Sequence, residues 1–225
     1  PLEVSLNNQQ FSSESLLFTY HDVATVSGFG PMAGPSDGGT RVVVRGGGLS
    51  GGSDYRCRFD ECGVCHTAWS CHACVVNGTY VPPAELGAFE SILCESPRLG
   101  SWREGAVSSS VLLEVSLNSQ QFTNSSSSDL EYTYYEPAFV SSVSPNLGPT
   151  DGLTLLTIRG SALNGTGSDL QCRFDSSVVA ATRGASTEEW LCRAPKAPIA
   201  DGSTVSFQVS LNGQQFGTAS VAFAS

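Results

Sequence analysis

Four cysteines that lie close together have the spacing most suggestive of chemistry. The segment from residue 62 to residue 74 doubles a Cys-x2-Cys pattern and includes two histidines. Zinc binding, thiol redox chemistry and structural disulfides are the alternatives. Zinc ribbons separate such pairs by about 15 to 20 residues, whereas five intervene here, and the βαβ context of a redox motif is missing. We expect two disulfides, with no metal and no cofactor, among Cys62, Cys65, Cys71 and Cys74.

A Gly-x-Ser-x-Gly pattern around Ser50 matches the nucleophile motif of serine hydrolases. That motif requires a sharp turn from a strand into a helix, and no helical pattern follows Gly52. The chain offers three histidines as a general base, and two of them lie in the cysteine segment. We therefore expect no enzyme activity.

The charge of the chain excludes several classes of partner. Its formal net charge is -10, only 14% of its residues are charged, and Lys196 is the single lysine. Nucleic acids and anionic membrane surfaces both require clustered positive charge, so neither is expected as a partner. The sequence also has no apolar run of about 18 residues, so this segment is not expected to insert into a membrane.

Cysteine content and glycosylation signals indicate the secretory route. Eight cysteines suit an oxidising compartment, where disulfides persist. Three Asn-x-Ser/Thr sequons agree with this location. The expected N-glycosylation sites are Asn77, Asn124 and Asn164. The serine run is a possible O-glycosylation segment, comprising Ser125, Ser126, Ser127 and Ser128. We expect an extracellular protein that carries covalent glycans, as a secreted, cell-surface or fibre component.

A nine-residue block that occurs three times sets the organisation of the chain. The copies are Glu3–Phe11, Glu114–Phe122 and Gln208–Phe216, each with a Leu-Asn-x-Gln-Gln centre. Their spacings of 111 and 94 positions match a domain of about 100 residues, the size of an immunoglobulin-like sandwich. Alternating apolar segments separated by Gly, Asn and Asp turns predict strands, so an all-β fold is expected.

Two longer segments resemble the opening of an IPT/TIG domain, the immunoglobulin-like module of plexins and Met-type receptors. They are Val143–Leu163, with its Pro, Thr-Asp-Gly and strand-Gly spacing, and Val26–Gly46, which repeats it. The chain departs from the family pattern at Leu153, where a second glycine is usual. The resemblance implies tandem IPT/TIG β-sandwiches and an extracellular array, and it does not name a ligand.

The repeat divides the chain into one partial and two full units. Residues 1–22 are expected to form a β-hairpin, either from a preceding repeat or donated to a neighbouring subunit. Residues 23–136 and 137–225 are expected to be IPT/TIG-like domains, the first enlarged by a 17-residue cysteine-rich insertion at about 62–78. The one segment with any helical character is 84–93.

The position of the other cysteines in the repeat predicts their pairing. Cys57 is expected to pair with Cys94, and Cys172 with Cys192. Each bridge should stabilise its domain by about 3 to 4 kcal/mol, because it reduces the entropy of the unfolded chain. Trp190, two residues before Cys192, is expected in the core.

Two functional hypotheses remain at this point. The first is a structural subunit of an extracellular glycoprotein filament or fibre that self-associates, because tandem sandwiches with a short proline-containing connection form a rod. The second is the ectodomain of an adhesion or receptor protein that binds a protein or glycan partner through the cysteine-rich insertion.

Overall fold

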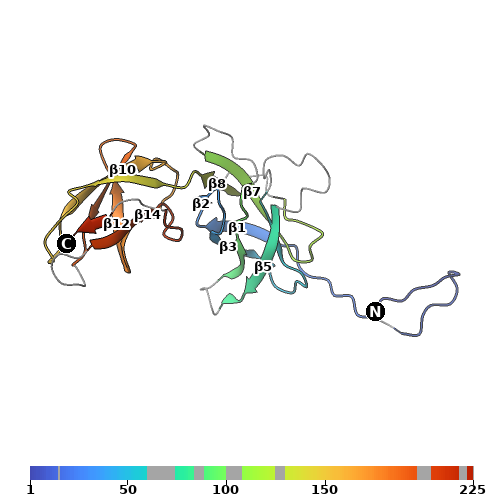
Figure 1. The fold of residues 1–225 in the computed structure, drawn as a ribbon. Helices are drawn as coiled ribbons and strands as arrows, with labels where there is room; N and C mark the ends of the chain where they lie inside the picture. Colours follow the sequence, from blue (N-terminus) through green and yellow to red (C-terminus); the bar gives the residue numbers. More distant parts are fainter. Residues whose placement is uncertain are drawn as a thin grey trace.

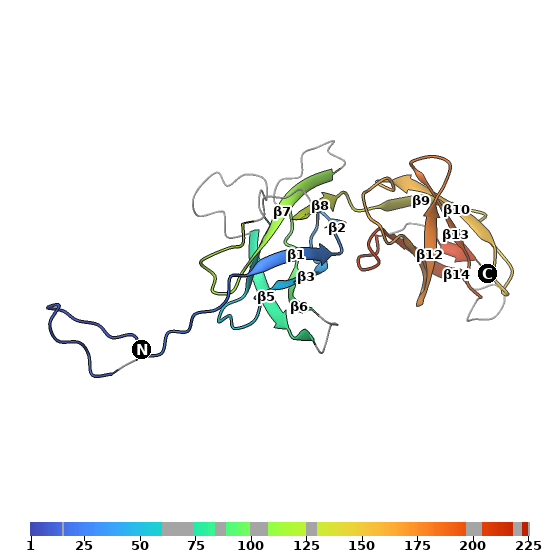
Figure 2. The same ribbon diagram turned by 180° about the vertical axis from the view of Figure 1, so that it is seen from behind.

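The computed structural model shows two β-sandwiches in succession, preceded by an extended N-terminal segment (Figures 1 and 2). The structure describes residues 1–14, 16–59, 74–83, 89–99, 108–124, 130–196, 204–217 and 222–224. All fifteen elements in these ranges are strands, so the expected all-β fold is confirmed.

The first sandwich is a single folded sheet with strand order β1-β3-β6-β5-β4-β7-β8-β2. Neighbouring strands are antiparallel except β2 and β8, which are parallel. Its strands are β1 (Thr25–Gly30), β2 (Ala33–Pro35), β3 (Arg41–Gly47), β4 (Arg56–Phe59), β5 (Val75–Val81), β6 (Glu90–Glu95), β7 (Ser108–Ser116) and β8 (Glu131–Tyr135).

The second sandwich repeats this arrangement with strand order β15-β14-β11-β12-β13-β10-β9. Its strands are β9 (Phe139–Ser144), β10 (Leu155–Ser161), β11 (Gln171–Phe174), β12 (Ser177–Arg183), β13 (Glu189–Arg193), β14 (Thr204–Ser210) and β15 (Ala222–Ala224). Strand β10 therefore corresponds to β3, and β14 corresponds to β7.

Strand pairing locates the extra residues of the first sandwich more closely than the sequence does. Structurally equivalent positions on β4 and β11 differ by 115 in residue number. The difference is 103 for β5 and β12, and 98 for β6 and β13. The excess of 17 residues is thus divided into 12 between β4 and β5 and 5 between β5 and β6. The prediction of one insertion at about 62–78 is wrong in this respect, because residues 75–78 belong to β5.

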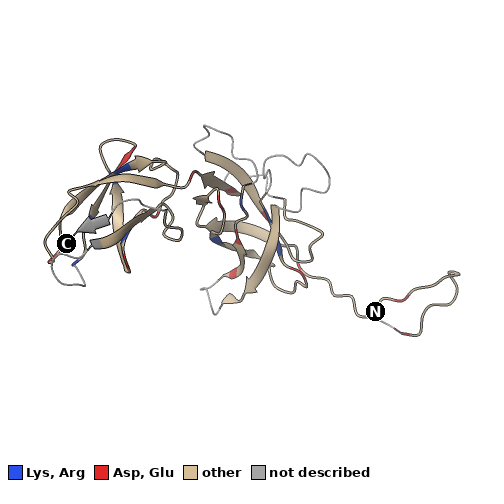
Figure 3. Cartoon of the chain, in the orientation of Figure 1, with Lys and Arg blue, Asp and Glu red and all other residues tan. Residues whose placement is uncertain are grey.

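Alternation of burial along the strands builds one apolar core in each sandwich. Strand β3 buries Val42 and Val44, and the equivalent β10 buries Leu156 and Ile158. Side chains two positions apart share a face of a strand, so these residues face the core. Trp190 is fully buried, as the sequence predicts. Charged residues of both signs are scattered over the two sandwiches (Figure 3).

The N-terminal segment does not form the expected pair of strands. It folds back on itself through two backbone hydrogen bonds between Leu2 and Leu16, and it extends away from the first sandwich (Figure 1). Leu6, Leu17 and Phe18 are exposed. A two-stranded ribbon with no partner for its apolar face is marginal in water, which explains the loose pairing.

Part of the segment 84–93, which its sequence suggested could be helical, is a β-strand. Residues 90–93 belong to strand β6, which pairs with β3 and β5, and 84–88 lie outside the described residues. Pairing on both sides overrides a weak local helical preference. Within the described ranges, no helix has the length and apolar character needed to cross a membrane.

Candidate functional site

The repeated Leu-Asn-x-Gln-Gln block forms the same compact loop in all three copies. In the second sandwich, Asn212 Oδ1 accepts hydrogen bonds from the backbone N–H groups of Gln214 and Gln215, both at 3.1 Å. The Asn212 Nδ2 group donates to Gln215 Oε1 at 2.7 Å. The asparagine side chain thus takes the place of a backbone turn.

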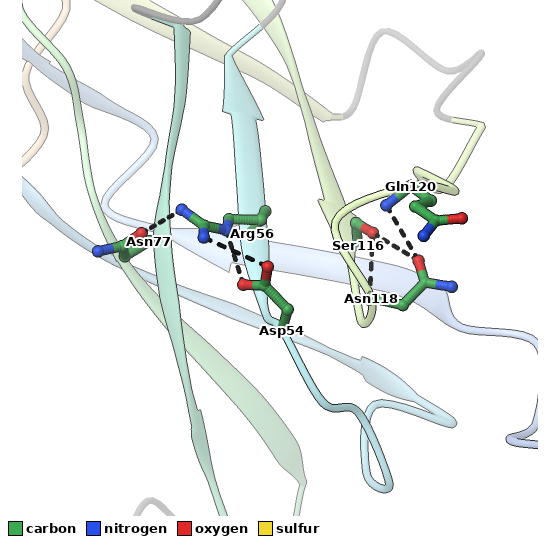
Figure 4. Close-up of polar contacts among 6 residues, drawn as sticks. All are labelled: Asp54, Arg56, Asn77, Ser116, Asn118 and Gln120. Atoms are coloured by element: carbon green, nitrogen blue, oxygen red, sulfur yellow. Dashed lines mark hydrogen bonds and ion pairs between the residues drawn. The ribbon is translucent and has the colours of Figure 1, made fainter. Parts of the chain in front are cut away.

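The other two copies have the same internal bonds. Asn118 Oδ1 accepts from the N–H group of Gln120 at 3.1 Å (Figure 4). It also accepts from the N–H group of Gln121 at 3.2 Å. Asn7 accepts from the corresponding pair in the N-terminal segment at 3.0 Å. The residue after the asparagine has φ between 59° and 71° in each copy, and it is Asn8, Ser119 or Gly213. A side-chain cap therefore allows a left-handed residue other than glycine here.

The loop of the second sandwich lies against the first sandwich, beside β2 and β3 (Figures 1 and 2). The side-chain amide of Gln214 makes two bonds with the backbone of Arg41. Its Oε1 accepts from the Arg41 N–H at 2.9 Å, and its Nε2 donates to the Arg41 carbonyl at 3.0 Å. This pattern is that of an added β-strand, so Gln214 recognises the strand edge whatever side chain residue 41 carries.

The neighbouring glutamine makes the junction more specific. Gln215 Oε1 accepts from the Thr40 hydroxyl at 2.9 Å, and Gln215 Nε2 donates to the Gly39 carbonyl at 2.7 Å. Asn212 Nδ2 lies 3.3 Å from Thr40 Oγ1. Thr40 is fully buried and Asn212 is 5% exposed, so these polar groups have been removed from water and are satisfied across the junction.

Apolar contacts accompany the polar ones. Ala33 of β2 and Tyr135 of β8 pack into the core of the second sandwich, with Leu211 directly before the loop. Burial raises the pKa of the Tyr135 hydroxyl, with nearby Tyr132 as a smaller cause. A methyl group at Gly165 would come within 2.5 Å of Leu211 Cδ2 and 3.4 Å of Tyr135, which indicates close packing at the junction.

The cysteines divide into pairs that the structure describes and residues that it does not. Cys57 is bonded to Cys94 across β4 and β6, and Cys172 to Cys192 across β11 and β13. These are the pairs that the repeat predicts. Cys74 is disulfide-bonded. The other members of the cluster, Cys62, Cys65 and Cys71, lie outside the described residues.

The three sequon asparagines are exposed. Asn77 lies on β5, and its Oδ1 accepts a hydrogen bond from the Arg56 guanidinium, which also pairs with Asp54 at 2.7 Å (Figure 4). The Nδ2 atom of Asn77, to which a sugar would be attached, makes no bond with another described residue. Asn124 and Asn164 lie in connections between strands. The serines 125–128 lie outside the described residues.

The Gly-x-Ser-x-Gly pattern does not form a nucleophile elbow. It lies between strands β3 and β4, with no helix after it, and Glu90 holds it by accepting from the Leu49 N–H at 2.8 Å. Hydrogen bonds from Ser50 and from the Leu49 N–H lower the pKa of Glu90. The carboxylate therefore stabilises a turn.

The junction is not predicted by local sequence patterns, although the sequence contains a signal for it. The asparagine caps the turn and its Nδ2 group binds the second glutamine, yet the first glutamine also recurs in every copy, without a side-chain bond to its own loop among the described residues. Gln9, Gln10, Gln120 and Gln121 are exposed, whereas their equivalents Gln214 and Gln215 are engaged in the junction. A repeated residue whose side chain its own loop does not use indicates an external contact.

Comparison with known proteins agrees with this architecture. A structure of the plexin A4 extracellular region, domains 1 to 10, matches with a TM-score of 0.54 and 18% identity, covering 87% of this chain and 15% of that one. A second plexin A4 structure, domains 1 to 8, matches with a TM-score of 0.47 and 18% identity, covering 97% and 20%. At 18% identity, this likeness shows a similar fold. The comparison with curated proteins gives no match.

The IPT/TIG domain family matches residues 24–134 and again residues 138–225. These two ranges correspond to the two sandwiches, and together they cover most of the chain. The chain therefore belongs to the IPT/TIG domain family, of which it carries two tandem copies.

Proposed function

We propose that this chain is part of an extracellular receptor or adhesion ectodomain, in which consecutive IPT/TIG domains are held end to end as a spacer. The main support for this proposal is the junction, where Gln214 and Gln215 bind the edge of the preceding domain. A connection of only a few residues between β8 and β9 supports a restricted hinge, because Pro137 lies within it. Such a segment positions other domains rather than performing chemistry.

The plexin likeness favours this proposal over a filament subunit. The matched plexin structure is an extracellular region in which several domains follow one another, and the present chain spans 15% of its length. The disulfides at Cys57 and Cys172 suit the same oxidising environment. We further propose that the whole ectodomain binds a protein or glycan partner.

We also propose N-linked glycans at the three sequons, with the Asn77 site the best defined. Arg56 binds Oδ1 of Asn77, an atom that remains a carbonyl after glycosylation, and thereby orients the side chain. Glycopeptide mass spectrometry should find sugar on Asn77, and Thr79→Ala should remove it without changing β5. Peptides that are bare at all three asparagines after secretion from eukaryotic cells would contradict the proposal.

Antibody labelling of intact cells tests the location. The antibody should bind unpermeabilised cells that express the full-length protein, and brief external protease treatment should remove the signal. Signal that appears only after permeabilisation would exclude an ectodomain. A cytoplasmic marker on the same cells is the control for membrane integrity.

A further inference from the structure

The edge that receives the loop on the first sandwich is present again on the second. In both, the second residue of the Asp-Gly pair bonds to a proline carbonyl at 2.9 Å, as Gly38 to Pro35 and Gly152 to Pro149. The φ angles are 79° and 78° at Gly38 and Gly39, and 79° and 66° at Gly152 and Leu153.

The next two hydrogen bonds of this edge are also shared. Gly39 donates to the Ser96 carbonyl at 2.8 Å, and Leu153 donates to the Ala194 carbonyl at 2.9 Å. The carbonyls of Thr40 and Thr154 accept from the same two partners at 2.8 and 2.9 Å. The backbone that Gln214 and Gln215 bind on the first sandwich is therefore reproduced at residues 153–155.

Nothing among the described residues covers this second edge. Strand β9 pairs with β10 only from Thr157 onward, so Leu155 lies beyond the paired region, as Arg41 does on β3. Thr154 is partly exposed, whereas Thr40, which bonds to Gln215 of the loop, is fully buried. Leu153 is 74% exposed, and its carbonyl accepts a 3.3 Å bond from the exposed side chain of Arg193.

Replacement of glycine by leucine at this edge is compatible with a bound loop. With the loop in place on the first sandwich, a methyl group at Gly39 would have only Glu95 Oε1 near it, at 4.0 Å. A side chain at this position therefore points away from the loop. The Leu153 carbonyl has two lone pairs, so it can accept from a glutamine beside Arg193.

We infer that residues Leu153–Leu155 bind the Leu-Asn-x-Gln-Gln loop of a further IPT/TIG repeat. The first glutamine of that loop pairs with the backbone of Leu155, and the second bonds to the Thr154 hydroxyl and the Leu153 carbonyl. The occupant is identified by the loop already seated on the equivalent edge in this chain. The loops at Asn7 and Asn118 are folded in the same way and bind no sandwich edge among the described residues, so they supply the occupant in a second copy of the chain.

The inference rests on the junction of the proposed function and deepens it by naming the partner of a second edge. It is tested by nuclear magnetic resonance on the full chain, with isotope-labelled protein titrated by unlabelled protein up to about 2 mM, the range for a contact made by a few hydrogen bonds. The amides of Leu153, Thr154 and Leu155 should shift with concentration.

The matched titrant replaces the four exposed glutamines by alanine, Gln9→Ala, Gln10→Ala, Gln120→Ala and Gln121→Ala. It should leave these amides unshifted, while the signals of its own 212–215 loop show that its junction is intact. Absence of shifts with the wild-type titrant, or equal shifts with both titrants, would overturn the inference. Neither result bears on cell-surface labelling, so the two proposals fail separately.

Discussion

The two sandwiches place the same disulfide across equivalent strands but support the turn beside it by different chemistry. In the first, the turn at Leu49 is held by the Glu90 carboxylate, and Tyr55 stacks on Tyr80 with ring centroids 5.8 Å apart. In the second, the equivalent Leu163 carbonyl accepts from Trp190 Nε1 and from Arg183, both at 2.9 Å.

Features that both sandwiches share are required by the fold, whereas the features that differ between them can vary. Both sandwiches keep the bridge, the buried strand positions and a glycine at the β-bulge, where a methyl group at Gly46 or Gly160 would come within 2 Å of a backbone oxygen. The groups that support the turn differ because several donors or acceptors can satisfy one loop. Substitutions that exchange features between the domains should therefore reveal how much each contributes.

The largest effect is expected when Trp190 is replaced by its counterpart, Ile92. Trp190→Ile removes a fully buried ring and leaves a cavity, which should destabilise the second sandwich by about 2 to 4 kcal/mol. Hydrogen exchange should show faster opening of β13 and unchanged protection of β6. Ile92→Val is the matched control, with an expected cost of about 1 kcal/mol in the first sandwich. Equal losses in both sandwiches would mean that the cores are not independent.

The sequence predicted the parts of the fold that depend on local patterns and internal repetition. Alternating residues such as Val42 and Val44 indicated strands, and the spacing of Cys172 and Cys192 indicated their pairing. The division of the insertion could not be predicted, because only strand register shows that residues 75–78 pair with β4 and β6. The junction was missed because contact between Gln214 and Arg41 joins positions 173 residues apart.

The second largest effect is expected at the junction. Gln214→Ala with Gln215→Ala removes the bonds to Arg41, Thr40 and Gly39, and the buried Thr40 hydroxyl loses the acceptor Gln215 Oε1. The coupling between domains should fall by about 1 to 3 kcal/mol. Residual dipolar couplings and small-angle scattering should then report a wider range of interdomain angles.

The equivalent loop of the first sandwich supplies the control for that experiment. Gln120→Ala with Gln121→Ala changes two exposed side chains in a loop of the same conformation, so the interdomain angle should remain as in the wild type. If both double variants broaden the angle equally, the glutamines act on their own loop and not across the junction.

A smaller effect is expected from the arginine that lies over the aromatic ring of each repeated block. Arg58 stacks on Phe122 and pairs with Glu114 at 2.8 Å, whereas Arg173 stacks on Phe216 and bonds to the neutral Gln208 at 2.9 Å. Glu114 is buried, and Glu114→Gln keeps an acceptor for Arg58 but removes the charge, so it should cost the first sandwich about 1 kcal/mol.

The reciprocal change, Gln208→Glu, should stabilise the second sandwich by a similar amount. Both differences should shrink in high salt, because screening weakens an ion pair more than a neutral hydrogen bond. Chemical denaturation at low and high salt measures this. A loss from Glu114→Gln that is independent of salt would assign the difference to packing.

The smallest effect is expected from protonation of Glu90, which supports the turn in the first sandwich only. Hydrogen bonds from Ser50 and the Leu49 N–H lower its pKa, so their stabilisation is present above the usual pKa of glutamate and is lost as the pH falls below it. The Leu49 amide signal should move in acid, while the turn at Leu163 stays unchanged because its carbonyl is held by the Trp190 indole N–H and the Arg183 guanidinium rather than by a carboxylate. Glu90→Gln should abolish the pH dependence at Leu49. Movement that persists in this variant would assign it to another carboxylate.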